Sequence, residues 1–346
     1  MKHQTTRYGE IPFYKIGTFG NTADAFISKK LFLEYKTKYS FPKKGDILIS
    51  ASGTIGRAVI YDGKPAYFQD SNIVWIDNDE TLVKNDFLFY AYSNVKWNTE
   101  HTTILRLYND NFRNTLIPLP PLNEQIAIAN ILSDMDHYLC SLDALILKKE
   151  SVKKALSFEL LSQRKRLKGF NQAWQRVRLG DIANYSTSNL SVEQITQQGK
   201  IKVYDVNNFI GYTDTTFISD KPYISIVKDG SVGRVRILPP KTNILSTMGA
   251  LIANHRTTTE FLFYLLSNFD FKNFTSGSII PHIYFKDYKE KTIFLPPLNE
   301  QSAIADILSD LDNEIASLKN KKRQFDNIKK ALNHDLMSAK IRVLKK

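Results

Sequence analysis

An eighteen-residue segment of this chain occurs twice. LPPLNEQIAIANILSDMD at residues 119–136 returns as LPPLNEQSAIADILSDLD at residues 295–312, and only three of the eighteen positions differ. The offset of 176 residues leaves room for a whole domain between the copies. The repeat therefore predicts that one supersecondary unit is used twice as a common frame, which presents the more variable sequence before each copy.

Composition narrows the class of protein. A chain of 346 residues exceeds one ordinary core, so two domains with connecting segments are expected. The formal charge of +12 favours a polyanionic partner, with nucleic acid ahead of an acidic protein or of incidental basicity. The single cysteine, Cys140, is expected in a helix seam and excludes an internal disulfide or a Cys-rich zinc site. With no secretory signal and no apolar run of about 18 residues, a cytoplasmic protein without membrane contact is expected.

Two long helices are predicted, one from each copy of the repeat onward, because apolar residues recur there every three or four positions. The first should begin at its N-cap Asn123 and end at Arg166, before Gly169. Its seam comprises Ile128, Leu132, Met135, Leu139, Leu142, Ile146, Val152, Leu156 and Leu160. The second seam comprises Ile304, Leu308, Leu311, Ile315, Leu318, Lys322, Phe325, Ile328, Leu332 and Leu336, with the lysine expected to snorkel. One-sided helices are not stable alone in water, so an antiparallel pair is expected.

The sequence before each copy of the repeat is predicted to form short strands and loops. Residues 27–63 alternate apolar and polar side chains and are expected in strands, whereas Phe87–Val95 is expected as a short buried helix capped by Asp86. GTIGRAVI at residues 53–60 is echoed by GSVGRVRI at 230–237, and FLFYAYSN at 87–94 by FLFYLLSN at 261–268. We therefore expect one fold used twice, with different surfaces.

The echo also predicts a difference between the two domains. Residues 174–200 precede the strand expected at Ile201, but only ten residues precede the matching strand at Ile11. The first domain is thus expected to lack an N-terminal opening segment of about 17 residues. A partial subunit that pairs with a second copy or fragment is one alternative that this leaves open.

The motifs together resemble the specificity subunit of a type I restriction-modification system. LPPLNEQ followed by AIA-x-ILSD-x-D occurs twice, and Trp174, RLGDI at 178–182 and the GTIGR and GSVGR turns add to the likeness. The resemblance implies an α+β fold with two α/β target recognition domains, separated by an antiparallel coiled coil of two long conserved helices in a pseudo-two-fold internal repeat. The implied parts are recognition domain 1 at residues 1–118, the central helix at 119–168, recognition domain 2 at 169–294 and the distal helix at 295–346.

The resemblance also implies a function. Each recognition domain would bind one half of a split site in double-stranded DNA. The helices would dock two modification subunits, which carry the adenine methyltransferase activity, and restriction subunits with nuclease and translocase activity would join indirectly through them. The chain would be a non-catalytic subunit without a cofactor, in a complex that defends against foreign DNA.

Polar and basic side chains in the turns of each domain are the predicted DNA contacts, because they suit phosphates and base edges. In the first domain they are Lys43, Lys44, Ser50, Ser52, Thr54, Arg57, His101, Thr102, Thr103, Arg106 and Asn109. In the second they are Ser231, Arg234, Arg236, His255, Arg256, Thr275, Ser276, Ser278, His282 and Tyr284. The structural alternative is that Gly53 and Gly56 merely permit a tight hairpin with solvated polar neighbours, and that residues 254–257 cap a helix.

The frame supplies the predicted partner contacts. They are Pro120, Pro121, Glu124 and Gln125 in the first copy and Pro296, Pro297, Glu300 and Gln301 in the second. An identical surface in both copies would suit two identical partners bound in pseudo-two-fold fashion. The alternative is that these residues only begin a helix. The basic stretches at 163–168 and 319–323 are expected as solvated helix faces.

No catalytic or metal-binding pattern is recognisable. The chain has neither a phosphate-binding G-x-x-x-x-G-K-[ST] loop nor H-E-x-x-H, and its prolines do not occur in the [ND]-P-P-[YF] segment of adenine methyltransferases. A methyltransferase or nuclease fused to recognition domains is therefore disfavoured. A coiled-coil protein scaffold with incidental basicity is the other alternative, and only a DNA-binding protein should lose affinity steeply with salt.

Overall fold

The computed structural model describes residues 4–68, 72–97 and 106–344. The chain divides into two compact units, one of Met1–Asp143 with Asn320–Lys346 and one of Ala144–Lys319. The long helices α4 (Leu122–Leu161) and α7 (Leu298–Met337) run through both units. Each unit therefore contains the beginning of one long helix and the end of the other.

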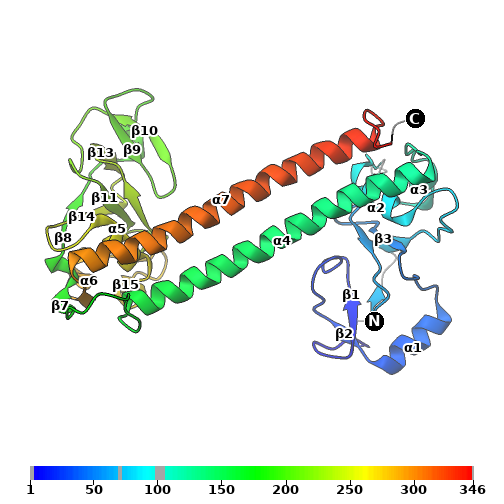
Figure 1. Ribbon diagram of the computed structural model, residues 1–346, viewed down its shortest axis with the longest axis horizontal. Coiled ribbons are helices and arrows are strands. Elements are labelled where there is room, and N and C mark those ends of the chain that lie inside the picture. Colours follow the sequence, from blue (N-terminus) through cyan, green and yellow to red (C-terminus); the bar gives the residue numbers. More distant parts are fainter. Residues whose placement is uncertain (1–3, 69–71, 98–105, 345–346) are drawn as a thin grey trace. The chain divides into compact units, whose positions relative to one another are not determined.

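The first unit contains two three-stranded sheets and three short helices (Figure 1). In sheet order the strands are β2 (Phe26–Ile27), β1 (Ile11–Tyr14) and β5 (Tyr67–Phe68), then β4 (Ala58–Ile60), β3 (Ile47–Ser50) and β6 (Ile73–Trp75). The helices are α1 (Lys29–Lys38), α2 (Asn85–Asn94) and α3 (Asn109–Arg113). Leu88 of α2 packs with Ile49 of β3, and Phe87 of α2 packs with Leu132 of α4. Helix α2 thus connects the β3 sheet to the long helices.

The second unit follows the same plan with more strands (Figure 1). Its main sheet is antiparallel, in the order β12 (Val235–Leu238), β11 (Tyr223–Val227), β14 (Met248–Ala253) and β8 (Ala183–Thr187). The other strands are β10 (Phe209–Thr213), β9 (Ile201–Tyr204) and β13 (Thr242–Ile244), β15 (Thr275–Ser276) with β16 (His282–Ile283), and β17 (Thr292–Leu295) with β7 (Gln175–Arg178). The helices are α5 (Thr259–Ser267) and α6 (Phe285–Tyr288), with 3₁₀ turns at Leu179–Asp181, Val192–Gln194 and Lys272–Phe274.

Helix α5 occupies in the second unit the place that α2 has in the first. Its Phe261 and Leu262 share one buried cluster with Ile224 of β11, Leu251 of β14 and Leu308 of α7. The predicted equivalence of residues 87–94 and 261–268 thus holds for their packing. The expected Asp86 cap of α2 is wrong, because the cap residue is Lys84 and Asp86 lies in the first turn.

The strand prediction for residues 27–63 is partly wrong. Residues 29–38 form helix α1 instead, whose N-cap Ser28 accepts a hydrogen bond at Oγ from the backbone N–H of Leu31 (3.3 Å). Phe32 and Tyr35 are buried about one helical turn apart, while Leu33 and Glu34 between them are exposed. The short apolar period was compatible with either structure, and the serine cap was the signal for a helix.

Within each unit the segments of α4 and α7 run antiparallel, as predicted. In the first unit Asp136 pairs with Lys329, and Asp143 with Lys322 at 3.2 Å. In the second unit Lys149 pairs with Glu314 at 2.8 Å, and Lys153 with Asp312. Partner numbers fall on one helix as they rise on the other, which defines the antiparallel register.

The predicted seam is correct at most positions and wrong at two equivalent ones. Val152 is 41% exposed and Ile328 is 52% exposed, and they lie 176 residues apart. At each place the neighbouring lysine, Lys153 or Lys329, is half-buried and paired with an aspartate of the facing helix. A strict heptad drifts around a straight α-helix, so the next residue in the sequence takes over the seam. The expectation for Lys322 is confirmed, since it is half-buried and reaches Asp143.

Three smaller predictions about α4 are also wrong. Cys140 is exposed because the seam passes through Leu139 and Leu142 on either side of it. The helix begins at Leu122 instead of being capped by Asn123, and it ends at Leu161 instead of Arg166. Gln163 has a φ of 61°, a left-handed conformation that reverses the chain after the helix.

The predicted fold class is confirmed. The chain is α+β, with two sheet-rich parts of related plan and two long helices that contribute to both. The predicted domain boundaries after residues 118, 168 and 294 stay a prediction. They assign each long helix to a part of its own, whereas each compact unit contains a portion of both helices.

Both units contain a glycine turn between two neighbouring strands of a sheet, β3 and β4 in the first unit and β11 and β12 in the second. Gly53 and Gly56 follow β3 with φ of 67° and 81°, and Gly230 and Gly233 follow β11 with φ of 82° and 80°. In each turn the second glycine lies against an aromatic ring, Trp97 in the first unit and Phe271 in the second. This glycine is therefore required both for its backbone angle and for the close approach of the ring.

We predict that Gly233→Ala destabilises the protein more than Gly230→Ala. Both substitutions force a left-handed φ on alanine, which costs about 1–2 kcal/mol. A Cβ at Gly233 would also lie 2.6 Å from Phe271, whereas nothing lies within 4 Å of one at Gly230. The clash should add roughly 1–3 kcal/mol. Urea unfolding of the full chain measures both, and equal losses would contradict the packing argument.

Candidate nucleic-acid and partner interfaces

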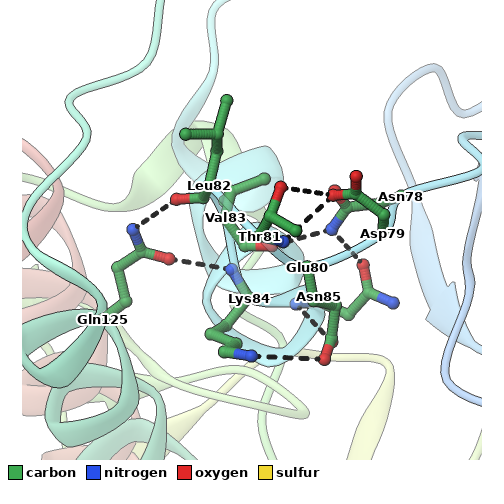
Figure 2. A network of polar contacts seen from close by, with 9 residues as sticks. All are labelled: Asn78, Asp79, Glu80, Thr81, Leu82, Val83, Lys84, Asn85 and Gln125. Atoms are coloured by element: carbon green, nitrogen blue, oxygen red, sulfur yellow. Dashed lines mark hydrogen bonds and ion pairs between the residues drawn. The ribbon is translucent and has the colours of Figure 1, made fainter.

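A buried glutamine at the start of α4 connects that helix to the loop before α2 in the first unit (Figure 2). Gln125 Oε1 accepts from the backbone N–H of Lys84 (2.8 Å), the cap residue of α2. Its Nε2 donates to the carbonyl oxygens of Leu82 (3.0 Å) and Pro120 (2.8 Å). Figure 2 also shows how the loop before α2 is held by its own polar contacts, including the Glu80–Lys84 pair. Gln125 thus bonds the N–H of the cap residue of α2 and the carbonyl oxygen of Pro120 before α4, and so joins the N-terminal ends of both helices.

Gln301 makes the same set of contacts in the second unit. Its Oε1 accepts from the N–H of Thr258 (3.0 Å), the N-cap of α5, and from the hydroxyl of Thr257 (2.8 Å). Its Nε2 donates to the carbonyl oxygens of Arg256 (2.9 Å) and Pro296 (2.8 Å). Both glutamines are fully buried. The backbone partners therefore correspond one to one between the two units.

The preceding glutamate anchors the chain that leaves the other long helix. Glu300 is fully buried and accepts from Arg166 Nη2 (2.6 Å) and from the Trp174 indole N–H (3.0 Å). The hydrogen bond to Glu300 raises the pKa of Arg166. In the first unit Glu124 is 5% exposed and accepts from Arg342 Nη2 (3.1 Å). The expectation that residues 163–168 form a solvated helix face is wrong for Arg166.

Tyrosine, aspartate and lysine form a third repeated contact, which joins α2 or α5 to both long helices. In the first unit Tyr90 donates to Asp136 (2.8 Å), which also accepts from Lys329. In the second unit Tyr264 donates to Asp312 (3.0 Å), which also accepts from Lys153.

The raised pKa values of the two tyrosines agree with these hydrogen bonds. Burial, and then the carboxylate of Asp312, raise the pKa of Tyr264. Burial, and then Asp136, raise the pKa of Tyr90 in the same way. The tyrosines therefore remain neutral donors to the aspartates.

The predicted partner contacts divide into buried and exposed residues. Glu124, Gln125, Glu300 and Gln301 are engaged inside their own units, and Pro296 is buried with them. Pro121 is exposed, and Pro120 and Pro297 are half-buried. Beside these prolines lie the exposed apolar side chains Leu119, Leu122, Ile126 and Leu298. A role of the frame in partner binding stays a prediction, and this surface is the part of it that a partner can reach.

In the first unit the structure brings several predicted DNA contacts to the turn between β3 and β4. Ser52 bridges to Arg106, and Thr54 and Arg57 are exposed beside them. Ser50 is buried and shapes the turn, since its hydroxyl donates to the Thr54 carbonyl oxygen and accepts from the Arg57 N–H (3.0 Å). Ser50 therefore serves the turn itself.

Other predicted contacts of the first domain lie elsewhere. Lys43 and Lys44 precede β3, at the opposite end of the β3–β4 hairpin from the glycine turn, and Lys43 pairs with Asp77 at 3.0 Å. That hydrogen bond raises the pKa of Lys43. Asn109 begins α3 and is exposed. His101, Thr102 and Thr103 lie outside the described residues.

In the second unit the equivalent turn between β11 and β12 lies against the β15–β16 hairpin. Residues Asp229 and His282 form a bridge between them, and Ser276 pairs with His282 within the hairpin. Arg234 and Thr275 line one shallow pocket together with Lys272. Exposed side chains gathered around this junction are Ser231, Arg234, Ser276, Ser278 and Tyr284.

The remaining predicted contacts of the second domain are separated from this junction. His255 and Arg256 follow β14 at the far end of the sheet, where the Arg256 carbonyl oxygen accepts from Gln301. Arg236 lies on β12, where its guanidinium donates to the Asn207 carbonyl oxygen (2.9 Å) and covers the Tyr204 ring. Residues 254–257 precede Thr258, the N-cap of α5, so none of them is the cap residue that the structural alternative expected.

Sequence reasoning missed three kinds of residue. Asp229 contacts His282. The sequence could have indicated this residue, because it directly precedes GSVGR as Ser52 directly precedes GTIGR. Arg166 and Arg342 lie 176 residues apart, as do Lys153 and Lys329. Local composition alone predicts that these basic residues are solvated. The fact that each recurs at the repeat offset is the only sequence feature that distinguishes them from their solvated neighbours.

Metal ligands and membrane segments were searched for throughout the described chain. Among residues 4–68, 72–97 and 106–344, no three His, Cys, Asp or Glu side chains gather so that they could hold a metal ion. Over those same ranges, no helix is both long and apolar enough to cross a membrane.

Comparison with known proteins gives a family match over most of the chain. The model of the type I restriction modification DNA specificity domain matches residues 1–149 and again residues 171–325. The MjaX type I restriction enzyme specificity subunit of Methanocaldococcus jannaschii is 29% identical over 335 residues, which are 86% of this chain and 79% of that protein.

Two further proteins are similar. A type I restriction enzyme specificity subunit of Haemophilus influenzae is 63% identical over 137 residues, which are 39% of this chain. That match spans 36% of the relative's own length. The crystal structure of a type I restriction-modification S subunit from M. genitalium has a TM-score of 0.62 at 20% identity, over 97% of this chain and 91% of that chain. At this identity the likeness concerns the fold.

We predict that Asp312→Asn lowers the free energy of unfolding by about 1–3 kcal/mol, because a neutral amide weakens the bonds from Tyr264 and Lys153. Asp306→Asn is the matched control on the same helix, where the side chain is exposed, and should change stability by less than about 0.5 kcal/mol. Urea unfolding of the full chain measures both variants. An effect of Asp312→Asn no larger than that of the control would exclude a role for the repeated contact in stability.

Proposed function

This chain belongs to the family of type I restriction-modification DNA specificity proteins, and we propose that its two units each recognise one half of a bipartite site in double-stranded DNA. The proposal rests on one observation. The glutamine and tyrosine–aspartate–lysine contacts recur in both units with equivalent partners, and each glutamate accepts from an arginine. The exposed loops that these contacts support differ in residue type. A common frame with different loops suits two different DNA sequences.

The chemistry of the loops supports DNA as the ligand. Arg57, Arg106, Arg234 and the serines and threonines around them are donors for phosphate oxygens and base edges. The formal charge of +12 adds a general attraction to a polyanion. Phosphate contacts would position each unit, and the side chains at the two turns would select bases.

The modification subunits are proposed to dock beside the start of each long helix. The apolar side chains of Leu122 and Leu298, at equivalent places in the two copies, are 38% and 48% exposed. Because the LPPLNEQ sequence around these leucines is repeated, two identical methyltransferase subunits can each bind beside one of them. Restriction subunits would then join through them.

The chain itself is proposed to select the site without catalysing a reaction. Adenine methylation and DNA cleavage are assigned to the partner subunits, and no cofactor is assigned to this chain. Because its substrate would be cellular or incoming DNA, the cytoplasm is the proposed location.

The test is adenine methylation mapped across the genome of cells that express a cognate modification subunit, with and without this chain. A split motif with a fixed gap should appear only when the chain is present. Replacing residues 169–294 by the same part of another specificity subunit should change one half of that motif. A motif unaffected by the exchange, or DNA affinity that is insensitive to salt, would contradict DNA recognition and favour a protein scaffold.

We predict that Leu298→Asp reduces the number of bound modification subunits from two to one, and that Leu122→Asp with Leu298→Asp abolishes binding. A charge in the proposed apolar contact would remain desolvated without a partner. Native mass spectrometry of the co-purified complex gives the stoichiometry. Ile328→Asp is the matched control, since Ile328 is an exposed apolar residue on α7 outside the frame. Two subunits retained on the double variant would exclude this surface.

A further inference from the structure

We infer that one pair of facing residues in each unit selects a base in its half-site. The pair is Ser52 with Arg106 in the first unit and Asp229 with His282 in the second. The inference rests on the proposed function and names the residues that would carry its specificity. Three observations support it: equivalent backbone positions, different side-chain chemistry, and an orientation fixed by a hydrogen bond.

The two pairs occupy the same place in the backbone. Both are antiparallel bridges from the residue immediately before the glycine turn, to Arg106 in the first unit and to His282 in the second. The adjacent hydrogen bonds agree, with Leu107 N–H donating to Ala51 at 2.7 Å and Ile283 N–H donating to Lys228 at 2.9 Å. Directly opposed residues of an antiparallel pair have side chains on the same face. Each unit therefore places two side chains together at this position. In the first unit Ser52 is only 8% exposed, so the half-buried Arg106 is the member of the pair that a base can reach.

The two pairs have equivalent backbone positions but different side-chain chemistry. Arg106 is a donor only, and its planar guanidinium suits the two acceptors O6 and N7 of guanine. In the second unit His282 Nδ1 lies 2.7 Å from Asp229 Oδ1. A carboxylate oxygen accepts a hydrogen bond, so the tautomer with the proton on Nδ1 fits this contact. In the uncharged ring Nε2 is then an acceptor, which suits the amino group of adenine or cytosine in the major groove.

Surrounding contacts hold the histidine in a defined but accessible position. The His282 and Asp229 side chains are 36% and 35% exposed. The Tyr284 ring stacks on the imidazole with centroids 6.5 Å apart and an interplanar angle of 26°. Ser276 faces His282 across the β15–β16 hairpin. An oriented acceptor at the surface, among further hydrogen-bonding side chains, is the arrangement that base recognition requires.

The experiment transfers the pair of the first unit into the second. The full chain with Asp229→Ser and His282→Arg is expressed with the modification subunit, and methylated motifs are compared with those of the unmodified chain. We expect one position of one half-site to change from adenine or cytosine to guanine, with the gap and the other half unchanged. The reciprocal variant, Ser52→Asp with Arg106→His, should change one position of the other half only.

A second variant keeps the test decisive if the exchanged pair disturbs folding. Asp229→Ala with His282→Ala removes both groups, and methylation of sites with a wrong base at that position should rise about tenfold relative to the correct site. Glu290→Gln is the control in the same unit, because Glu290 pairs with Arg178 at the surface (2.8 Å), and it should leave the motif unchanged.

The outcomes separate the two proposals. If the unmodified chain directs a split motif and the alanine pair leaves every position of it unchanged, the inference is overturned while DNA recognition stands. A lower melting temperature with an unchanged motif has the same meaning, since the pair would then only connect the hairpin to the turn. If the unmodified chain directs no motif, the proposed function and this inference both fail.

Discussion

The buried glutamines at the beginning of the long helices are the contacts on which the arrangement of each unit depends. A helix begins with backbone N–H groups that lack partners, and a buried beginning needs them satisfied. Gln125 and Gln301 accept from the cap residue of a second helix and donate to two carbonyl oxygens. One side chain thereby joins the N-terminal ends of two helices, α4 and α2 in the first unit and α7 and α5 in the second. Because α2 and α5 pack on the sheets, this contact helps to place each sheet against the beginning of a long helix.

The antiparallel pairing of the long helices also has a defined register. Leucine and isoleucine seams attract helices but permit sliding by a turn. The half-buried pairs of Lys153 with Asp312 and Lys329 with Asp136 permit only one alignment, because a shifted lysine or aspartate would lose its charged partner. Tyr264 and Tyr90 connect the same aspartates to the recognition helices. Helix register and sheet position are thus determined by one contact in each unit.

The sequence predicted the fold class and the paired helices because the repeat is long and nearly identical. It failed where a short segment suits two structures, as at α1, and where the seam drifts onto Lys153 and Lys329. It also grouped Lys43 and Arg256 with the turn residues, although strand direction places them at other ends of their sheets. Composition identifies side chains able to bind DNA, and only strand pairing determines which of them lie together.

The division between frame and loops has an energetic reason. Glu300 and Gln301 are fully buried, so removing either leaves partners unsatisfied inside the protein, at a cost of about 1–3 kcal/mol for each group. Asp229 and His282 are about one-third exposed, so water can replace part of the contact that a substitution there removes. A wrong base, by contrast, costs about 1–3 kcal/mol of binding. Substitutions at the glycine turns can therefore change the recognised base while the buried frame residues stay the same.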